Sequence, residues 1–495
     1  MKRFTKCSIS TALMLCMAMS AVAGCTQTDV TDPSQSSEAQ QTEPAQAEPE
    51  DINYTIDNIR QYVVGVDEPV ELEDGSTRPM INFDNAATTP ALQPVMDAVN
   101  DKLTMYGSIG RGYSIKSNLS TQIYEETRDK VLDFVNADSE RYTCIYVNTT
   151  TDGLNKLASA LIESPDDVVL STRIEHHAND LSWRERCHVI YAEVDDQGRV
   201  MYDDLERLLD ENPGVKYVAV TAASNVTGYV TDVHRVAQMA HEHGAKIIVD
   251  GAQIVAHRQF SMIGHTPEEN IDFFVFSAHK MYSPYGGGAI VGLKDVLNQH
   301  MPTFYGGGIV DIVTDNQVTY KEAPELYEAG SPNYPGVIGM GAAIDVLEEV
   351  GFDDISAHEQ VLVRKLIDGL KQFDNVIIYG DTEDISDRVG VVTFNFSDVN
   401  SQFLANKMSQ LGAGTRRGAF CAHPYVWRLM GIDEQEAMGF IGCDSAKTAG
   451  MIRASFGIYN TEEEVDEFLE ILAQALEDCH NNPILGADSD IPAAY

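Results

Sequence analysis

Basic residues are scarce in this sequence of 495 residues. It contains 34 Lys and Arg against 76 Asp and Glu, which gives a formal net charge of -42 at pH 7. A surface this acidic repels nucleic acid and the anionic faces of membranes, so the composition argues against a nucleic-acid partner. We interpret the excess of acidic side chains as a solvated surface.

Cysteines are also few, and they lack short paired spacings. Of the eight, two lie within the first 24 residues and a third is Cys25; the other five are Cys144, Cys187, Cys421, Cys443 and Cys479. An odd number without close pairs argues against a disulfide framework and against a zinc site, so we predict no metal centre. One of these thiols is therefore a candidate for chemistry.

The N-terminus has a basic start with Lys2, Arg3 and Lys6, followed by an apolar run over residues 12–22. This pattern predicts a secretory signal over residues 1–24, too short to remain as a spanning helix. The residues Val-Ala-Gly before Cys25 resemble a bacterial lipobox, which implies that the Cys25 thiol is acylated and becomes the new N-terminus. The alternative is ordinary cleavage nearby, with Cys25 left over.

Residues 26–51 contain no Lys or Arg and are rich in Gln, Ser, Thr, Pro, Ala, Asp and Glu. Such a composition cannot bury enough apolar surface to offset the entropy cost of ordering. We therefore expect residues 25–55 to form an acidic, flexible tether. Through the lipid on Cys25 it would hold a folded domain at the extracytoplasmic face of the cell membrane.

Helical patterns alternate with short apolar runs over the next part of the chain. The runs are residues 144–147, 168–170, 189–192, 217–221, 246–249, 273–276 and 289–291. Runs that are apolar on both faces, between helices, predict a mostly parallel sheet covered on both sides, which is an α/β fold. We assign residues 56–341 to this large domain, including an N-terminal extension.

The remaining residues 342–495 predict a smaller C-terminal α/β domain. Helical patterns cover residues 342–349, 355–373 and 461–477, and strand patterns cover residues 376–379 and 391–396. We find no internal repeat.

Polar residues stand where several predicted strands end, which is where α/β sheets collect ligands. Lys280 follows the strand at residues 273–276, and a lysine amine there can react with an aldehyde cofactor when its pKa is lowered. Asp250 ends another strand and can keep the ring nitrogen of such a cofactor protonated. Each feature alone is also typical of a solvated lysine or a helix-capping aspartate.

A threonine run opens a predicted helix after the strand at residues 144–147. Thr150 and Thr151 therefore lie at a helix N-terminus, where backbone N–H groups favour an anion such as a phosphate. Glu-His-His-Ala-Asn begins at Glu175, after another strand, and a histidine ring there can stack on a pyridine ring. Asn225 ends a further strand, and Arg453 offers a planar fork to a carboxylate.

Together these motifs resemble those of the class V, fold-type-I pyridoxal-phosphate (PLP) enzymes, and within them the cysteine desulfurases and selenocysteine lyases. The resemblance runs from about Asn82 to about Ala475 and includes Asp-Gly-Ala-Gln at Asp250 and Ser-Ala-His-Lys ending at Lys280. It implies PLP as the cofactor, bound covalently by Lys280, and a small amino acid as the substrate.

The resemblance also assigns roles to individual residues. It implies phosphate contacts from Thr150, Thr151, Ser277 and His279, ring stacking and proton handling by His176, and hydrogen bonds to the phenolic oxygen from Gln253 and Asn225. It further implies that Asn225, Arg416 and Arg453 bind the substrate. The loop Glu-Ala-Gly-Ser-Pro-Asn at 328–333 resembles one that reaches the cofactor phosphate of the other protomer, so we expect Ser331 to do this in a homodimer.

Cys421 lies in the stretch Thr-Arg-Arg-Gly-Ala-Phe-Cys-Ala-His-Pro, residues 415–424. A persulfide-forming cysteine must be an accessible thiolate near cations, and Arg416, Arg417 and His423 supply them. The stretch resembles the group II desulfurase loop Arg-Thr-Gly-His-His-Cys-Ala, except that Ala-Phe replaces the two histidines. Gly110 likewise stands where relatives carry a histidine. The alternative for Cys421 is a buried structural thiol.

We therefore predict a PLP-dependent enzyme that removes sulfur from L-cysteine, or selenium from selenocysteine, to give L-alanine through a persulfide on Cys421. Two alternatives stay open. One is a class V amino-acid aminotransferase or epimerase in which Cys421 takes no part. The other is a catalytically silent surface lipoprotein that binds an amino acid or cell-wall fragment.

Overall fold

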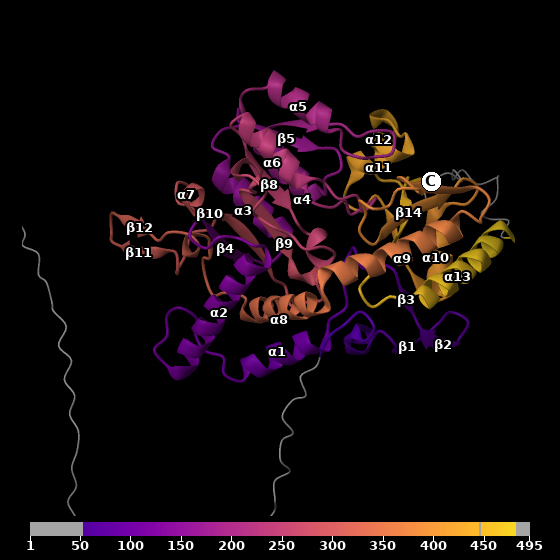
Figure 1. Ribbon diagram of the computed structural model, residues 1–495, viewed down its shortest axis with the longest axis horizontal. Helices are drawn as coiled ribbons and strands as arrows, with labels where there is room; N and C mark the ends of the chain where they lie inside the picture. The colour runs from indigo at the N-terminus through magenta and orange to yellow at the C-terminus, as the bar shows by residue number, and fades with distance from the viewer. Residues whose placement is uncertain (1–52, 445–446, 482–495) are drawn as a thin grey trace, which may run out of the picture. The chain divides into compact units, whose positions relative to one another are not determined.

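The computed structural model describes residues 53–444 and 447–481 (Figure 1). The predicted signal, Cys25 and nearly all of the predicted tether lie outside these residues, as do residues 482–495. Residues 53–55, the last three of the predicted tether, are among the described residues, and the Tyr54 N–H donates to Glu349 Oε1 at 2.9 Å. Within the part of the chain that the structure describes, no helix has the length and apolar character needed to cross a membrane.

A seven-stranded sheet forms the large domain, in the order β4-β10-β9-β8-β7-β5-β6. Its strands are β4 (Tyr142–Val147), β5 (Val168–Thr172), β6 (His188–Ala192), β7 (Val215–Thr221), β8 (Lys246–Asp250), β9 (Phe273–Ser277) and β10 (Gly288–Leu293). All seven predicted strands are present. Only β10 runs antiparallel to its neighbours, so the mostly parallel sheet is confirmed.

Both faces of this sheet are buried, as the apolar runs predicted. In β9, Phe274 and Phe276 pack on one face while Phe273 and Val275 pack on the other. The first face carries α2 (Ile115–Phe134), α5 (Tyr202–Glu211), α6 (Val233–Glu242) and α8 (Tyr334–Val350), with α1 (Gln93–Leu103) packed on α8. The second face carries α3 (Thr150–Leu161) and α4 (His177–Arg184). Helices therefore cover the sheet on both sides (Figure 1).

The smaller domain is built on an antiparallel sheet in the order β13-β14-β17-β16. These strands are β13 (Val376–Tyr379), β14 (Val391–Phe396), β16 (Arg416–Gly418) and β17 (Met451–Ser455). A second apolar core joins the sheet to α9 (Phe352–Leu370), α10 (Ser401–Gln410) and α13 (Glu462–Asn481). The domain also holds the short helices α11 (His423–Met430) and α12 (Glu434–Gly439).

The smaller domain is predicted to begin at residue 342. Residue 342 lies inside α8, and both halves of that helix pack in the core of the large sheet. The second core begins only at Leu362 in α9, and it also takes in Ile81 and Phe83 because β3 (Ile81–Asn82) pairs with β15 (Ala413–Gly414). A helical pattern alone gives no signal of which sheet the helix covers.

The structure also contains several short elements that are not part of these two sheets. They are α7 (Lys294–Leu297), the strand pairs β1 (Pro69–Glu71) with β2 (Thr77–Pro79) and β11 (Val310–Val313) with β12 (Val318–Tyr320), and the 3-10 turns η1 (Ile59–Tyr62), η2 (Ile254–Ala256), η3 (Pro267–Glu269), η4 (Ala278–Lys280) and η5 (Glu325–Tyr327).

Strand direction brings the functional residues to one edge. Strands β5, β7, β8 and β9 are parallel, and β4 points the same way because two antiparallel steps separate it from β9. Their carboxyl ends therefore meet, and ligands of such sheets bind at this edge.

Candidate active site

A cavity of about 230 Å³ lies at the carboxyl ends of the large-sheet strands. Every predicted catalytic, cofactor-binding and substrate-binding residue except Ser331 lines it. These residues are Thr150, Thr151, His176, Asn225, Asp250, Gln253, Ser277, His279, Lys280, Arg416, Cys421 and Arg453. Residues separated by more than 300 positions in the chain thus surround one space.

Lys280 ends the 3-10 turn η4, which directly follows β9. Burial lowers the pKa of the Lys280 amine to about 8, and the Asp250 carboxylate opposes this shift. Asp250 is the last residue of β8 and is only 2% exposed, and its burial raises the pKa of the carboxyl group. Its Oδ1 accepts the Ala252 N–H at 2.9 Å. A partly neutral amine and a buried carboxylate therefore share the cavity.

His176 and Gln253 contribute polar groups to the same space. His176 caps α4, with its Nδ1 accepting the Ala178 N–H at 3.0 Å. Burial, aided by the charge of Lys280, lowers the pKa of His176 to about 3, so the ring is neutral near pH 7. Gln253 donates from Nε2 to the Ala86 carbonyl at 2.9 Å, and its Oε1 is buried without a hydrogen-bond partner in the part of the chain described.

The N-terminus of α3, where a phosphate contact is predicted, lies at the cavity. Thr149 caps the helix, and the Thr150 N–H and hydroxyl both lie within hydrogen-bond distance of Ser277 Oγ, at 2.6 and 2.7 Å. The helix dipole favours an anion at this end of α3. His279 lies beside this site with its Nδ1 3.2 Å from Thr88 Oγ1, and burial lowers its pKa to about 4.

Two arginines from the small domain face the cavity. Arg453 on β17 is 2% exposed, and burial lowers its pKa to about 10 against the opposing effect of Asp84. Its Nη1 donates to the Asn225 carbonyl at 2.9 Å, and its Nη2 pairs with Asp84 Oδ1 at 3.1 Å. Arg416 on β16 reaches Asp84 Oδ2 at 3.5 Å.

Cys421 is exposed and lies on a tight turn between β16 and α11. The Ala422 N–H donates to the Ala419 carbonyl at 2.8 Å, and the two residues between them have φ of +48° for Phe420 and +56° for Cys421. These features define a type I′ turn, which normally takes Gly or Asn at both central positions. The flanking Ala419 and Ala422 are buried, so the strained turn is anchored at each end.

Of the two arginines expected near Cys421, the structure places only one at the cavity. Arg416 lines the cavity, but Arg417 points to the other face of β16, where its Nε donates to Ser401 Oγ at 3.0 Å. Residues alternate between faces along a strand, which explains the difference between these neighbours. The ring of His423 packs against the ring of His177 with centroids 4.6 Å apart, and burial lowers the pKa of both imidazoles.

Ser331 is exposed and lines a second cavity, outside the one at Lys280. Its loop is fixed by Glu328, whose carboxylate pairs with the buried Arg128 at 2.9 Å and accepts the Tyr146 N–H at 2.8 Å. The role expected of Ser331 requires a second protomer and stays a prediction.

The sequence analysis did not predict a role for three residues that lie at or beside the cavity. Asp84 joins the two arginines, and Phe420 places its ring over the Arg453 guanidinium at 4.8 Å. Glu175 is buried beside His176, where burial raises its pKa to about 8 and its Oε1 accepts the Thr221 N–H at 3.0 Å. Only Glu175 carried a sequence signal, because it opens the motif that contains His176.

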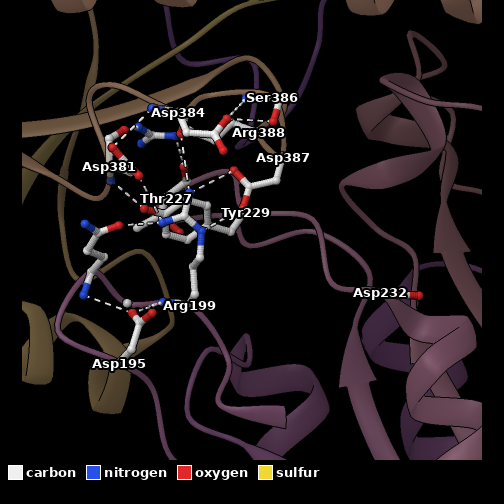
Figure 2. A network of polar contacts seen from close by, with 12 residues as sticks. Asp195, Arg199, Thr227, Tyr229, Asp232, Asp381, Asp384, Ser386, Asp387 and Arg388 are labelled. Carbon is white, nitrogen blue, oxygen red and sulfur yellow. Dashed lines mark hydrogen bonds and ion pairs between the residues drawn. The ribbon is translucent and has the colours of Figure 1, made fainter.

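A polar network around Arg388 joins Thr227 of the large domain to the small domain (Figure 2). Arg388, which is fully buried, donates from Nε to the Thr227 carbonyl at 2.8 Å and from Nη1 to the Asp381 carbonyl at 2.9 Å. Arg199 pairs with Asp387 at 2.8 Å. The network therefore fixes residue 227, two positions after Asn225, to the small domain.

The family model for class-V aminotransferases matches residues 81–468. The chain belongs to the class-V aminotransferase family. The cysteine desulfurase of Haloferax volcanii is 35% identical over 413 residues, 82% of this chain and 91% of that protein. A probable cysteine desulfurase of Halalkalibacterium halodurans is 34% identical over 419 residues, 83% and 95% of the two chains.

Solved structures agree with this family assignment. The apo cysteine desulfurase of Thermococcus onnurineus has a TM-score of 0.72 at 30% identity and covers 81% of this chain and 95% of its own. A cysteine desulfurase of Escherichia coli, in its S-sulfonic acid form, has a TM-score of 0.71 at 26% identity and covers 86% and 99%. The fold-type-I architecture and the assignment as a class-V enzyme are thereby confirmed.

The residues of the cavity fit PLP, the cofactor of class-V aminotransferase-fold enzymes. A buried carboxylate at Asp250 suits a protonated ring nitrogen, and the unpartnered Gln253 Oε1 marks a polar position that the protein alone leaves unsatisfied. The α3 N-terminus suits a phosphate, and Lys280 has the lowered pKa needed for covalent attachment.

Proposed function

We propose that this chain removes sulfur from L-cysteine, or selenium from selenocysteine, in a PLP-dependent reaction that yields L-alanine. The observation that carries the proposal is the exposed Cys421 thiol on a turn that lines the same cavity as Lys280 and Arg453. Relatives named as cysteine desulfurases, at 30–35% identity, support it.

Bound PLP would supply an electron sink for the bonds at the substrate α-carbon. The residues that would hold it are Asp250 at the ring nitrogen, Gln253 at the phenolic oxygen, His176 against the ring, and Thr150 with Ser277 and His279 at the phosphate. Because Asp250 is buried, its ionised form gains most when a positive charge sits beside it, so this residue would select the protonated ring.

The substrate is held and deprotonated by the protein. Arg453 and Arg416 would bind its carboxylate, since guanidinium groups form paired charge-assisted hydrogen bonds with carboxylates. The Lys280 amine, with a pKa near 8, would remove the α-proton because a base of this strength is partly neutral at physiological pH. The neutral His176 ring would assist by hydrogen bonding through Nε2, since its Nδ1 already accepts the Ala178 N–H.

Cys421 would accept the sulfur. Its thiolate sulfur forms an S–S bond to the substrate sulfur while the bond from that sulfur to the substrate β-carbon breaks. The electron pair of the broken bond stays with the carbon, which takes up a proton and becomes the methyl group of alanine. The products are L-alanine and a persulfide on Cys421, from which an added thiol releases sulfide.

The test is alanine and sulfide formation from L-cysteine in the presence of dithiothreitol, for the wild type and Cys421→Ala. We expect a loss of at least about a hundredfold in the variant, because the sulfur has no acceptor. Cys443→Ala is the matched control, since Cys443 is the other exposed thiol of the described residues. Equal rates in the wild type and Cys421→Ala would remove Cys421 from the mechanism.

Two other outcomes would select the alternatives. Racemisation or transamination of an amino acid without alanine release from cysteine would indicate an aminotransferase or epimerase. Ligand binding without exchange of the α-proton in heavy water would indicate a binding lipoprotein.

We also propose a homodimer with composite active sites. Large apolar side chains are exposed near the Ser331 loop, including Tyr113, Ile115, Phe304 and Tyr305, and Arg111 donates to the Gly330 carbonyl at 3.3 Å. A second copy covering these side chains would bring Ser331 to its cofactor phosphate. Sedimentation should show a dimer, and Tyr305→Asp with Ile115→Asp should dissociate it. A monomeric wild type would contradict this proposal.

Finally, we propose acylation of Cys25 and an extracytoplasmic, membrane-anchored location. The support is the basic and apolar pattern of residues 1–24 and the small residues before Cys25. A clickable fatty acid should label the wild type and not Cys25→Ala. Label that persists in the variant, or protein found only in the cytosol, would contradict this assignment.

A further inference from the structure

Phe420 forms the bulky apolar part of the cavity wall. Of the described residues that line this cavity, Phe420 alone has a large apolar side chain, and the other apolar ones are Cys421 and alanines. Its ring lies over the Arg453 guanidinium, with 4.8 Å between Cζ and the ring centroid. The wall beside the arginine that would bind the substrate carboxylate is therefore an aromatic ring.

The backbone fixes the position of this ring. The Phe420 carbonyl accepts the hydrogen bond from Asn225 Nδ2 at 2.7 Å, and the Ala422 N–H closes the turn onto the Ala419 carbonyl at 2.8 Å. The contact of the ring with the Arg453 cation adds to this restraint. The ring is therefore held at the arginine both through its backbone and through its face.

Arg453 has a donor left for a ligand. Its Nη1 and Nη2 contact the Asn225 carbonyl and Asp84, whereas its Nε is buried without a hydrogen-bond partner among residues 53–444 and 447–481. A ligand carboxylate that binds this guanidinium lies next to the Phe420 ring. In an amino acid the α-carbon carries both the carboxylate and the side chain, so the side chain leaves the α-carbon close to the ring.

The space beside the ring is small. The cavity measures about 230 Å³, below the roughly 300–1,000 Å³ of pockets that hold drug-sized ligands, and PLP would take part of it. For the proposed reaction the substrate side chain must also reach Cys421, which directly follows Phe420 in the turn. A short side chain such as that of cysteine satisfies both conditions, whereas a longer one meets the ring.

We propose that Phe420 is a specificity-determining residue whose ring limits the substrate side chain to about the length of that of cysteine. Amino acids with longer straight or aromatic side chains are excluded by contact with the ring. The inference deepens the proposed function and rests on it in placing the substrate carboxylate at Arg453 and the substrate side chain toward Cys421.

The test measures size selectivity without turnover. Propionate and hexanoate are titrated calorimetrically into the holoenzyme of the wild type, Phe420→Gly and Phe420→Tyr. In Phe420→Gly we expect hexanoate to strengthen relative to propionate by at least about tenfold, because even one methylene group in an apolar pocket changes binding by that factor. Phe420→Tyr keeps the ring and should keep the wild-type ratio. An unchanged ratio in Phe420→Gly would overturn the proposal.

The ratio separates a size limit from a loosened turn. Glycine adopts the positive φ of residue 420 without strain, so Phe420→Gly removes the ring and keeps the turn. Loss of the ring contact with Arg453 would weaken both carboxylates alike and would leave the ratio unchanged. If Phe420→Gly does not fold, Phe420→Leu takes its place and should shift the ratio in the same direction by a smaller factor. An unchanged ratio in Phe420→Leu would then overturn the proposal.

The matched control is Phe440→Gly. The Phe440 ring is half-buried, packs on the Trp427 ring with centroids 5.8 Å apart and lines a different cavity. Its removal should leave the ratio unchanged. A shift as large as that of Phe420→Gly would show that the effect does not come from the wall of this cavity, and would overturn the proposal.

Exchange of the α-proton in heavy water gives a second measurement. The wild type should exchange L-alanine faster than L-norleucine, and Phe420→Gly should narrow this difference by at least about tenfold. Neither amino acid contains sulfur, so the measurement does not depend on the Cys421 thiol. If the wild type releases no alanine from L-cysteine but the carboxylate ratio shifts as expected, the proposed reaction fails and the role of Phe420 stands.

Discussion

The Asn225 side chain donates from Nδ2 to the main-chain oxygen of Phe420 at 2.7 Å. At the next residue, the His177 N–H donates to the Cys421 carbonyl at 2.6 Å. Two loops of the large domain therefore hold the turn that carries the thiol, and both belong to the motifs around His176 and Asn225. The position of Cys421 depends on the cofactor site, although the residue belongs to the small domain.

Asn225→Leu should loosen this turn. The variant loses a hydrogen bond worth about 1 kcal/mol, so the Ala422 N–H, which closes the turn, should exchange with solvent about fivefold faster. Hydrogen exchange followed by mass spectrometry measures this rate. The control is Asn406→Leu, which removes the hydrogen bond that Gln402 Nε2 donates to the exposed Asn406 Oδ1 on α10. Equal exchange rates of the Ala422 N–H in the wild type and Asn225→Leu would show that the turn is stable without the Asn225 hydrogen bond.

The left-handed backbone at Cys421 predicts an unusual order of stability. Because the residue has φ of +56° and an exposed side chain, Cys421→Gly should be about 1 kcal/mol more stable than Cys421→Ala. Urea unfolding of the two variants measures the difference. At Cys443, which is exposed and outside the left-handed region, Gly should instead be equal to or less stable than Ala. If the Gly variant were more stable than the Ala variant at both positions, the result would contradict backbone strain at Cys421.

The strands and the cavity could be predicted from the sequence because their signals are local. An apolar run marks each strand, and chain direction alone brings Asp250 and Lys280 to the same edge. The motif resemblance supplied their partners in the small domain, and the structure gathers Arg453 and Cys421 in the same cavity.

Other features of the site depend on how strands that are distant in the chain align with each other, and the sequence alone gives no signal of this alignment. Asp84 pairs with Arg416 and Arg453, more than 300 residues further along the chain, because its bridge to Ser455 brings it beside β17 and the register of β16 with β17 sets the two arginines opposite each other. Arg417 seemed equivalent to Arg416 along the chain, yet strand alternation turns it away. The turn at Phe420 and Cys421 lacks the Gly or Asn that would have marked it.

The amine of Lys280 should react with PLP over an unusual pH range. Burial lowers its pKa to about 8, so in the apoenzyme the neutral amine becomes the main form above that pH, well below the ordinary value of about 10.4. The rate of PLP attachment, trapped with borohydride and located by mass spectrometry, should rise with a midpoint near pH 8. Lys280→Arg is the control and should trap no PLP.

Asp250 should shift this midpoint in a defined direction. Its carboxylate favours the charged form of Lys280, so Asp250→Asn should lower the pKa of the amine further and move the midpoint to lower pH. A midpoint that stays in place, or moves up, would show that the two groups do not interact in the apoenzyme.

Arg388 should be the most sensitive residue of the interdomain network (Figure 2). It is fully buried, and among residues 53–444 and 447–481 its guanidinium donates only to carbonyl oxygens, those of Thr227, Asp381 and Tyr379. Arg388→Met would leave these oxygens buried without this donor, which we expect to cost about 3 kcal/mol of unfolding free energy.

The matched control is Arg199→Gln in the same network, where the pairs with Asp387 and Asp381 are partly exposed. Arg199→Gln should lower the free energy of unfolding by less than about 1 kcal/mol, because solvent screens such ion pairs. Urea unfolding of both variants measures the two costs. If Arg388→Met loses no more stability than Arg199→Gln, other donors or water replace the guanidinium, and Arg388 does not hold the Thr227 loop to the small domain.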